Sequence, residues 1–505
     1  METDHTTQAN PPTLHDTLSD GPTNAPPKRH TVVIVGGGPH ALAALSALHE
    51  SSLALAQFSS DPYGASGLSI GVRKRLGIEK LTKIGSVCVV DPGMGFLEAW
   101  DRRFEALEIT HLRSPALAHP RVYEPQALVH FAVSKGRTSE LLNPPEFSKR
   151  LATSGGYGQE PLLFALPTRE LFKDFCVSLS EELPHEWIQA NAEEIFKDEN
   201  TGKFRVRYAS GIKDGWIVAD SVILATGPAT QLNIPAQFRP YVNSGHVTHT
   251  EKFLSGEKSV ATLLARYPKK SRVLIIGGGL TAAQAAVAAV TTGSYVVLRS
   301  RRPLMTRSYD LHEDWLDQRH SNRLRYEFLA TPTNERLRII RSAIRGGSIP
   351  NRYLRKLQYL ASTTDRLLLE VCEDLEDSVV RVEEERVHVD GEAFDHLILA
   401  TGYSNAPAQS PLFQQVIKEL ELQTLNEFPI LDESLSWKGD LYVLGASASL
   451  ELGPGALNLM GAMRGARIVA EALRDLMWSS PKRQVLSSVV SSNSYSVLDQ
   501  IDVCV

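Results

Sequence analysis

Two glycine-rich segments of the chain have the residue types and spacing needed to bind phosphate groups. Residues 32–48 read VVIVGGGPHALAALSAL, and residues 273–290 read VLIIGGGLTAAQAAVAAV. Each segment predicts a buried strand, a tight turn and an alanine-rich helix whose N-terminus stabilises negative charge. The first glycine permits the bend, the next lets a pyrophosphate approach the backbone, and a small residue lets the helix pack on the strand. The residues predicted for these three roles are Gly36, Gly38 and Ala41 in the first copy and Gly277, Gly279 and Ala282 in the second.

The residue at the end of the second strand indicates which nucleotide each copy prefers. In the first copy the strand SVCVVDP places Asp91 at its end, where a carboxylate would accept hydrogen bonds from ribose hydroxyls. Asp91 lies further along than the usual spacing of about 20 residues. We therefore infer an insertion at 51–80, a stretch rich in Ser, Gly, Lys and Arg. Asp61 is the rival, although no clear strand precedes it.

The second copy carries arginines in place of the acid. Its strand SYVVLRSRRP ends in Arg299, Arg301 and Arg302 without a carboxylate. Guanidinium groups suit the 2′-phosphate of a nucleotide through bidentate hydrogen bonds, whereas the alternative is an ordinary basic surface loop. The two strand ends together predict FAD at the first site and NADPH at the second.

A second pair of repeats follows the first. Residues 221–227 read SVILATG and residues 396–402 read HLILATG, each after one of the glycine-rich turns. Each predicts a buried strand that ends in Ala-Thr-Gly. The candidate cofactor contacts at these strand ends are Thr226, Gly227, Thr401 and Gly402.

The repeats predict an α/β fold with two Rossmann-like dinucleotide-binding domains, the NADPH domain being inserted in the FAD domain. Residues 441–475 begin as a strand and end as a helix, so we expect them to return to the first domain. The predicted ranges are a disordered tail at 1–30, the FAD domain at 31–235 and 395–478, the NADPH domain at 245–390 and a flexible tail at 479–505.

The composition excludes several classes of protein. Hydrophobic residues make up 42% and charged residues 22% of the chain, as in ordinary globular proteins, and the net charge of −5 does not suggest a nucleic-acid partner. The four cysteines form no CxxC pair and no zinc-ligand spacing, so we expect no metal site and a reducing, cytoplasmic compartment. No apolar run reaches the roughly 20 residues that span a bilayer, so we expect no stable membrane anchor.

Further motifs make the chain resemble the class B flavin-dependent monooxygenases, which include N-hydroxylating and Baeyer–Villiger enzymes, over most of 31–475. Residues 245–253 resemble the linker between the two domains of that family, through Gly245, His249 and Phe253. A loop histidine bonded to backbone is the alternative interpretation of His249.

Two other segments carry the same resemblance. Residues 395–407 resemble the family signature of Asp, three residues and Leu-Ala-Thr-Gly-Tyr, through Asp395 and Tyr403. The LGPGALNL segment at 452–459 resembles the part that closes over the flavin, where Gly453 and Asn458 are candidate contacts.

Single residues refine the resemblance. Arg169 in the segment LPTRELFKDF resembles a family residue that lies near the cofactors, although an ordinary helix start is the alternative. Ala446 departs from the pattern, because many related flavoproteins have an acid there for the ribityl chain.

The resemblance implies an NADPH-dependent FAD monooxygenase. NADPH would reduce FAD, and the reduced flavin would react with oxygen to give a peroxyflavin. A water-excluded pocket would preserve this species until a small-molecule substrate is oxygenated. The protein would position and shield the reactants, so no catalytic residue is assigned. The N-hydroxylating branch is preferred because of the Asp395 and Tyr403 signature, and a role in secondary metabolism is expected.

Two alternatives stay open. The first is an NADPH-dependent FAD oxidoreductase without oxygen insertion, although the missing CxxC disfavours a disulfide reductase. The second is a non-enzymatic regulatory flavoprotein, because residues 111–120, with His111, Arg113 and His119, resemble a motif of oxidative stress-induced growth inhibitor proteins. Retention of both glycine-rich turns argues against the second. The acidic segment DLHEDW at 310–315 could meet a cation, but a solvated loop is the simpler interpretation.

Overall fold

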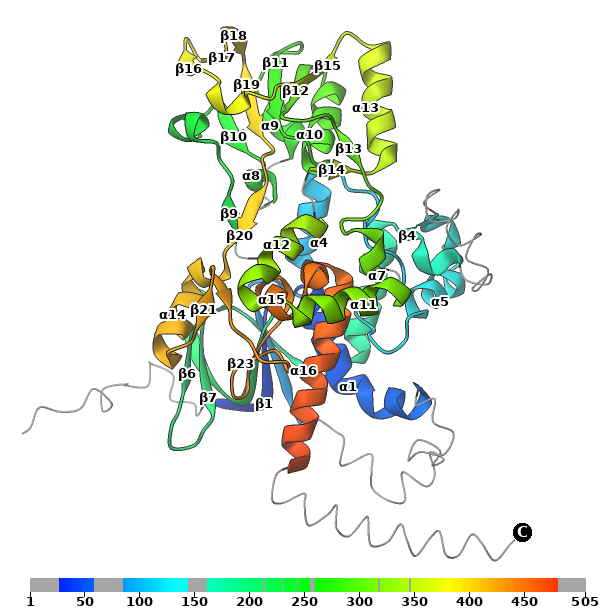
Figure 1. Cartoon of the computed structure of the whole chain (residues 1–505), viewed down its shortest axis with the longest axis vertical. Coiled ribbons are helices and arrows are strands. Elements are labelled where there is room, and N and C mark those ends of the chain that lie inside the picture. The colour runs from blue at the N-terminus through cyan, green and yellow to red at the C-terminus, as the bar shows by residue number, and fades with distance from the viewer. Residues whose placement is uncertain are drawn as a thin grey trace, which may run out of the picture.

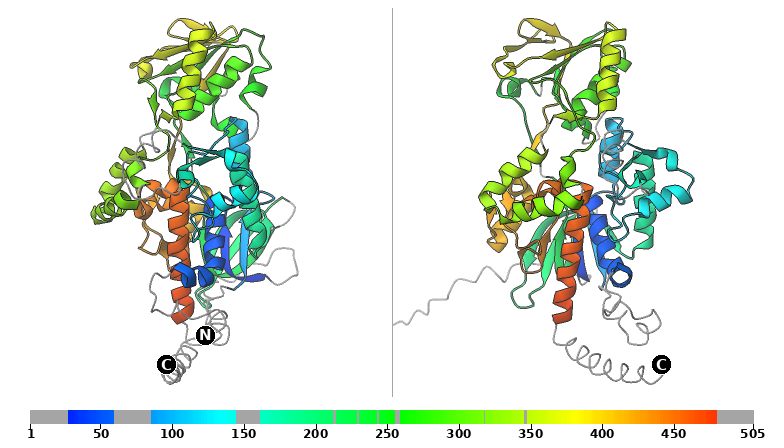
Figure 2. Two further views of the ribbon diagram at one scale, coloured as in Figure 1. Left: turned by 90° about the vertical axis from the view of Figure 1, so that its right-hand side faces the viewer. Right: turned by 45° about the vertical axis from the view of Figure 1, so that its right-hand side comes forward.

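The computed structural model describes residues 27–58, 85–143, 161–211, 214–228, 230–242, 244–254, 259–316, 318–344 and 347–479. Two α/β domains are stacked along the long axis of the molecule and meet at a narrower waist (Figure 1, Figure 2). Asp61 and most of the insertion expected at 51–80 lie outside these ranges.

The first domain contains an eight-stranded sheet. Its strands are β1 (Lys28–Val35), β2 (Val87–Asp91), β5 (Glu186–Gln189), β6 (Asn191–Lys197), β7 (Phe204–Ala209), β8 (Asp214–Leu224), β23 (Ser436–Lys438) and β24 (Leu441–Val443). The order is β23-β24-β8-β1-β2-β5, and β7 and β6 extend from β8 as antiparallel strands. β1 is parallel to both β2 and β8, and its buried run 32–35 is apolar throughout, as expected for a strand covered on both faces.

Helices complete this domain. They are α1 (Pro39–Phe58), α4 (Glu98–Ala106), α5 (Ala127–Ser134), α7 (Arg169–Glu182), α14 (Pro411–Leu420), α15 (Ser449–Leu452) and α16 (Leu459–Ser479). α1 and α16 pack side by side, so the beginning and end of the described chain share one core (Figure 1). The first helix is rich in alanine because a close helix pair leaves little space for larger side chains.

The second domain contains a five-stranded parallel sheet. Its strands in spatial order are β10 (Val247–His249), β19 (His396–Leu399), β11 (Arg272–Ile276), β12 (Tyr295–Ser300) and β15 (Leu367–Val371). The helices packed on it are α8 (Glu251–Leu254), α9 (Val260–Leu264), α10 (Leu280–Thr291) and α13 (Asn351–Thr363). The small sheet of β16 (Val380–Glu383), β17 (Arg386–Val389) and β18 (Glu392–Phe394) adjoins it.

A two-stranded ribbon joins the domains. β9 (Thr230–Leu232) enters the second domain, β20 (Tyr403–Asn405) leaves it, and the two strands pair antiparallel at the waist (Figure 1). The N–H of Asn233 donates to Gly402 O at 3.0 Å, which continues the ribbon. The α/β class, with two Rossmann-like units and one inserted in the other, is therefore confirmed.

Part of the second unit returns to the first domain. Between β13 (Met305–Thr306) and β14 (Ser348–Ile349), the helices α11 (Gln318–Ala330) and α12 (Thr333–Ile344) lie beside α15 and α16 (Figure 1). We call residues 305–349 the excursion. Its buried side chains share one apolar cluster with the first domain. The members from the excursion include Tyr309, Leu311, Trp315, Phe328 and Leu337, and those from the first domain are Leu166, Phe428 and Leu450.

Three boundaries differ from the expected ranges. β1 begins at Lys28, inside the range expected for the N-terminal tail, because residues 28–30 pair with 217–219 of β8. The polar residues Lys-Arg-His gave no sign in the sequence that the strand begins there. α1 continues to Phe58, into the stretch expected as an insertion. The excursion packs on the first domain although it lies within 245–390.

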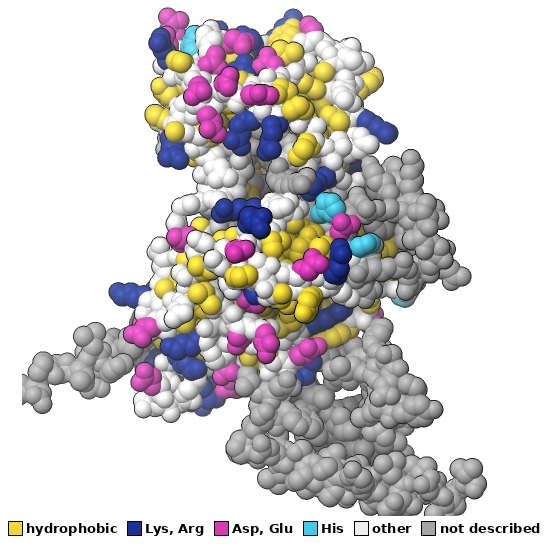
Figure 3. Space-filling view, viewed as in Figure 1, with side chains coloured by type: hydrophobic (Ala, Val, Ile, Leu, Met, Phe, Trp, Pro, Cys, Tyr) yellow, Lys and Arg dark blue, Asp and Glu magenta, His cyan; other side chains and the backbone are white. Residues whose placement is uncertain are grey.

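None of the described helices has the length and apolar character needed to cross a bilayer. On the face shown in Figure 3, basic and acidic side chains are interspersed over both domains.

The second glycine-rich turn should tolerate no side chain at its first glycine. Gly277 has a φ of 152°, and a Cβ there would lie 2.3 Å from Ala400 O. We expect Gly277→Ala to lower the free energy of unfolding of the second domain by about 3 kcal/mol, from backbone strain and a clash. Chemical denaturation measures this change.

The matched control is Gly391→Ala in the same domain. Gly391 also has a positive φ, 84°, but a Cβ there meets no atom within 4 Å. It should cost only about 1 kcal/mol, the strain of a left-handed residue. Equal losses in the two variants would contradict the steric argument.

Candidate functional site

The first glycine-rich turn is packed on the first Ala-Thr-Gly segment. Gly36 has a φ of 116°, and a Cβ there would lie 2.3 Å from the carbonyl oxygen of Ala225. The N–H of Ala225 donates to Val35 O at 2.8 Å, and the N–H of Gly36 donates to Val90 O at 2.9 Å. The turn is thus held by both neighbouring strands, and Thr226 and Gly227 follow at the same edge of the sheet.

The second turn has the same construction. A Cβ on Gly277 would meet Ala400 O at the same distance of 2.3 Å. The N–H of Ala400 donates to Ile276 O at 2.8 Å, and the N–H of Gly277 donates to Arg299 O at 3.0 Å. The two pairs of sequence repeats are therefore two copies of one interlocked unit, which brings Thr401 and Gly402 to the second turn.

Ala41 and Ala282 occupy corresponding places one turn into the helices α1 and α10. Both are fully buried. Their small side chains let each helix begin directly over its strand.

Asp91 lies at the end of β2, beside the first turn. Its Oδ2 accepts from the N–H of Gly37 and its Oδ1 from the N–H of Gly93, both at 2.7 Å. Burial raises the pKa of Asp91, while these two backbone donors lower it. A Cβ on Gly38 would meet no atom within 4 Å, so the backbone at this position is open to a ligand. The residues present thus fit a phosphate at Gly38 and hydroxyl groups near Asp91.

Ser300 occupies in the second copy the place that Asp91 has in the first. The N–H of Gly36 donates to the carbonyl of Val90, which precedes Asp91. The N–H of Gly277 donates in the same way to the carbonyl of Arg299, which precedes Ser300. The Cβ of a substituted Gly278 would also lie 3.5 Å from Ser300 Cβ. The Ser300 hydroxyl donates to Arg302 O at 2.8 Å, which orders the loop that follows.

The three arginines at this strand end have different environments. Arg299 is buried, and its guanidinium forms ion pairs with Glu370 at 2.8 Å, Glu392 at 2.9 Å and Asp390 at 3.6 Å. The guanidinium of Arg299 is therefore already paired with carboxylates of its own domain. Arg301 and Arg302 are exposed, and Arg301 has one partner, Glu376 at 2.9 Å. An exposed pair of this kind contributes little free energy, so Arg301 can exchange it for a ligand.

The segment 453–458 approaches the first turn from the other end of the chain. His40 Nε2 lies 3.0 Å from Ala456 O, and burial lowers the pKa of His40 to about 4, so the ring is a neutral donor near neutral pH. The same ring packs on Gly445, which has a φ of 73°. His40 therefore ties the phosphate-binding helix to this segment, a role that the local sequence does not reveal.

Asn458 organises the start of α16. Its Oδ1 accepts from the N–H groups of Met460 at 3.1 Å and Gly461 at 3.2 Å. Its side chain also bonds to Asp310, whose pKa is raised by burial and lowered by neighbouring Arg113 and by this bond. Gly453 has a φ of 80°. The geometry shows Asn458 as a helix cap and a link to the excursion.

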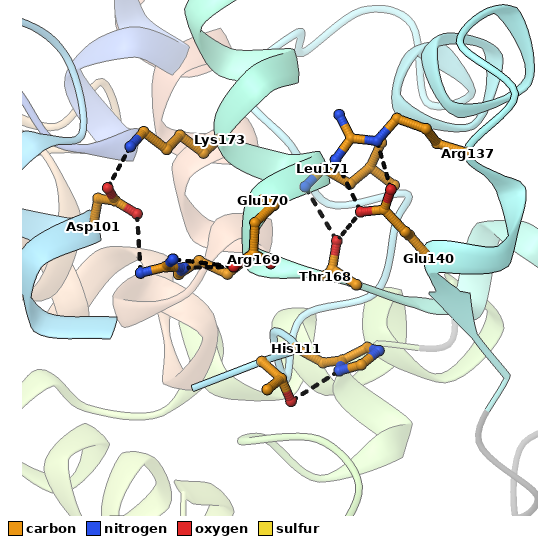
Figure 4. A network of polar contacts seen from close by, with 10 residues as sticks. Asp101, His111, Arg137, Glu140, Thr168, Arg169, Glu170, Leu171 and Lys173 are labelled. Atoms are coloured by element: carbon orange, nitrogen blue, oxygen red, sulfur yellow. Dashed lines mark hydrogen bonds and ion pairs between the residues drawn. The ribbon is translucent and has the colours of Figure 1, made fainter. Parts of the chain in front are cut away.

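Arg169 lies in a polar network between α4 and α7 (Figure 4). Its guanidinium pairs with Glu170 at 3.0 Å and Asp101 at 3.6 Å, and Lys173 also pairs with Asp101 at 2.5 Å. Thr168 caps α7 by accepting from the N–H of Leu171 at 3.1 Å. Arg169 is thus the first residue of a capped helix, and its side chain contacts acids of the first domain.

Arg113 joins the first domain to the excursion. Its guanidinium donates to the carbonyls of Tyr309 at 2.5 Å and Arg307 at 3.1 Å, and to the Ser348 hydroxyl at 3.1 Å. Burial lowers the pKa of Arg113, and the charge of Asp310 raises it. Gly347, the residue before Ser348, lies against the second turn, because its Cα is 3.7 Å from a Cβ placed on Gly279. Arg113 therefore links the segment 111–120 to the part of the excursion that lies beside the second turn.

The linker and signature residues are structural. His249 is buried, with Nδ1 accepting from the N–H of Glu251 at 3.1 Å, and Phe253 lies in the core of the second domain. Asp395 accepts from the N–H of Arg272 at 2.7 Å and pairs with Arg386 at 3.1 Å. Asp395 ties the start of β11 to the start of β19, and His249 also bonds to the backbone of Gly402.

The acidic segment 310–315 forms no metal cluster. His312 pairs with Asp314 at 3.4 Å. Among the described residues, no three His, Cys, Asp or Glu side chains converge in a way that could hold a metal ion.

Comparison with known proteins agrees with this geometry. Residues 162–334 match the profile of the pyridine nucleotide-disulphide oxidoreductase family. A search of curated proteins gives no match.

Solved structures of N-hydroxylating enzymes have similar folds. The ornithine N-hydroxylase of Kutzneria sp. 744 is 15% identical with a TM-score of 0.61, over 89% of this chain and 99% of its own. The cadaverine monooxygenase of Erwinia amylovora is 17% identical with a TM-score of 0.59, over 88% and 94%. The L-lysine 6-monooxygenase of Pseudomonas syringae is 16% identical with a TM-score of 0.57, over 88% and 99%. The predicted resemblance to class B monooxygenases is confirmed in the fold.

His119 should make stability depend on pH. It is fully buried, its Nε2 lies 3.3 Å from Pro125 O, and burial lowers its pKa to about 4. Because the unfolded chain binds a proton at a higher pH than the folded chain, stability is fully present above about pH 6.5 and is lost as pH falls toward 4. From this one residue we expect a loss of about 3 kcal/mol.

Urea unfolding of the wild type and of His119→Gln between pH 4 and 7 tests this expectation. Because the other titrating groups are the same in both proteins, the difference in the pH dependence of their free energies of unfolding reports on His119. The free energy of unfolding of His119→Gln should fall less steeply with decreasing pH than that of the wild type. The exposed His130 provides the control, His130→Gln. A slope in His119→Gln equal to that of the wild type would disprove the assignment.

Proposed function

We propose that the protein is an NADPH-dependent FAD monooxygenase that oxygenates a small molecule. One observation carries the proposal: two copies of the same interlocked turn end their second strands differently, with Asp91 in one and Ser300 followed by two exposed arginines in the other. This difference favours one nucleotide with a free ribose hydroxyl and one with a 2′-phosphate.

FAD is assigned to the first domain. The N-terminus of α1 and the open backbone at Gly38 would hold its pyrophosphate, and Asp91 its ribose. Thr226, Gly227 and the segment that contains Gly453 would surround the rest of the cofactor. Asn458 would support this segment from the start of α16, and Arg169 would contribute through the position of α7.

NADPH is assigned to the second domain. Gly277 and Gly279 would place its pyrophosphate at the N-terminus of α10, and Arg301 and Arg302 would hold the 2′-phosphate. Arg299 is excluded from this role, because three carboxylates already surround it. Thr401 and Gly402 would line the same turn.

The chain would position and shield the reactants. FAD, when bound, supplies the capacity to accept a hydride from NADPH and to activate oxygen. Arg113 of the first domain binds the excursion, and the excursion lies over the segment 453–458 through Leu311, whose Cδ2 lies 3.7 Å from a Cβ placed on Gly455. Such cover would exclude water from the space between the cofactors.

Amines are the first substrate class to examine. The three similar structures carry the names of enzymes that act on ornithine, cadaverine and lysine. The Asp395 and Tyr403 signature supports the same branch.

Disulfide reduction is disfavoured, because the described part of the chain contains no dithiol. Cys88 and Cys176 are buried in β2 and α7, and burial raises the pKa of both thiols. Thiols of this kind are poor nucleophiles.

Stopped-flow absorbance tests the proposal. Purified protein loaded with FAD is reduced with NADPH and mixed with oxygenated buffer. We expect a transient species that differs from both oxidised and reduced flavin and persists while NADP⁺ is bound. With the right amine it should yield one oxygenated product for each NADPH.

Other results would redirect the assignment. Immediate reoxidation with release of hydrogen peroxide, unchanged by any amine, would favour the oxidoreductase without oxygen insertion. A protein that binds FAD but never oxidises NADPH would favour the regulatory flavoprotein.

The choice of nucleotide gives a separate prediction. Arg301→Ala should weaken NADPH binding tenfold or more, because a charged hydrogen bond contributes roughly 1.5–3 kcal/mol, and should leave NADH binding nearly unchanged. Fluorescence titration with each nucleotide measures both constants. Arg323→Ala, on the exposed side of α11, is the control. Equal losses for the two nucleotides would remove the 2′-phosphate assignment.

A further inference from the structure

The strand β15 forms one edge of the five-stranded sheet in the second domain. It pairs with β12 on one side, and within the described ranges no strand pairs with its other side (Figure 1). The opposite edge of this sheet is different, because the three residues of β10 are all buried. An unpaired edge presents a row of backbone N–H and C=O groups that can bind another strand.

The backbone groups of β15 alternate in direction. The carbonyl of Arg366 accepts a hydrogen bond from β12 at 2.7 Å, and the N–H of Cys372 donates one to β12 at 2.9 Å. Residues two apart in a strand direct their backbone groups to the same side, so the even-numbered residues face β12. The N–H and C=O groups of Leu367, Leu369 and Val371 therefore point outward, away from β12.

The side chains at this edge are apolar and reach solvent. Leu368 and Val371 are each 53% exposed, whereas Leu367 is buried in the core of the domain. The strand reads LLLEV and contains neither proline nor lysine. Natural proteins place these two residues on edge strands to prevent pairing with another chain. The outer edge of β15 therefore lacks the usual protection.

The charged residues around Leu368 are complementary. Arg366 precedes it by two residues and Glu370 follows it by two, so the three side chains lie on one face. Arg366 forms no ion pair with any described residue. Glu370 bonds to Arg299 through its Oε2, at 2.8 Å, and its Oε1 is left for another donor. An antiparallel copy of the strand would place each Arg366 opposite the other copy's Glu370.

The direction of the backbone groups favours the same register. When Leu368 lies opposite its own copy, Leu367 lies opposite Leu369, and both have outward backbone groups. Such a pair exchanges two hydrogen bonds. The two Leu368 residues then form a non-hydrogen-bonded pair, in which the side chains lie closest. Centring the pairing on Leu369 instead would set Leu368 against the charged Glu370.

We propose that two copies of the chain associate through β15, antiparallel about a two-fold axis at Leu368, and so join their second sheets into one. The two-fold axis makes each hydrogen-bonded pair and each Arg366–Glu370 pair occur twice. Because one strand of five residues forms a small interface, we expect a dissociation constant of about 10 µM. This association is independent of the proposed function, since no residue assigned to FAD or NADPH takes part.

Sedimentation equilibrium of the full-length protein tests the association. The wild type should change from a monomer of 55.6 kDa to a dimer as its concentration rises through about 10 µM. Leu368→Lys, which sets two ammonium groups against each other at the axis, should weaken the dimer at least tenfold. Leu329→Lys is the matched control, because Leu329 is also exposed, by 42%, but lies on α11 outside this sheet.

A cysteine at the axis tests the register. The Cα atoms of a non-hydrogen-bonded antiparallel pair lie about 4.5 Å apart, within the range that a disulfide bond spans. Leu368→Cys should therefore form a covalent dimer under mild oxidation, faster than the wild type or Leu329→Cys. Non-reducing electrophoresis measures the covalent dimer.

A wild-type protein that remains monomeric far above the expected dissociation constant would overturn the proposal, even if a variant fails to fold. Equal dimerisation of Leu368→Lys and Leu329→Lys would also overturn it, because another surface would then hold the dimer. The same conclusion would follow if Leu368→Cys crosslinks no faster than Leu329→Cys. Loss of the dimer in Leu368→Lys together with rapid crosslinking of Leu368→Cys would support the proposed interface.

Discussion

A backbone carbonyl pressed against a glycine determines the architecture of both turns. In each copy, the strand that ends in Ala-Thr-Gly brings a carbonyl oxygen to the place where a side chain on Gly36 or Gly277 would be. The end of β1 can lie this close to the end of β8, and the end of β11 to the end of β19, only because these residues lack a Cβ. The helix that follows then starts at a fixed point, with free N–H groups at the edge of the sheet. The positions of Asp91 and Ser300 follow from this packing.

Within that common frame, one difference gives the two copies different chemistry. Asp91 presents a carboxylate that is oriented by backbone N–H groups. Ser300 presents a hydroxyl that turns back to its own loop and leaves the outer surface to Arg301 and Arg302. Arg299 points the other way and joins three acids, because neighbouring residues of a strand face opposite sides of the sheet.

Local patterns predicted the turns, while contacts between distant segments could not be predicted. Gly36 and Gly277 were found because the strand, turn and helix that define them are continuous in sequence. Arg299 was grouped with its neighbours because the sequence does not show where the strand ends, and a shift of one residue reverses the direction of a side chain. His40 depends on a partner 416 residues away, which no spacing rule indicates. The sequence of α11 likewise does not indicate the domain on which this helix packs.

The excursion changes how the two domains can move. A domain inserted through β9 and β20 alone would be attached at one narrow ribbon and could rotate about it. Here the chain crosses the waist again on each side of the excursion, and β13 pairs with β14 where it does so. Arg113 then fastens both crossings to the first domain. The second domain is therefore held at two separated points, and two supports of this kind resist twisting in a way that one does not. Rotation of the upper domain would have to bend the whole waist.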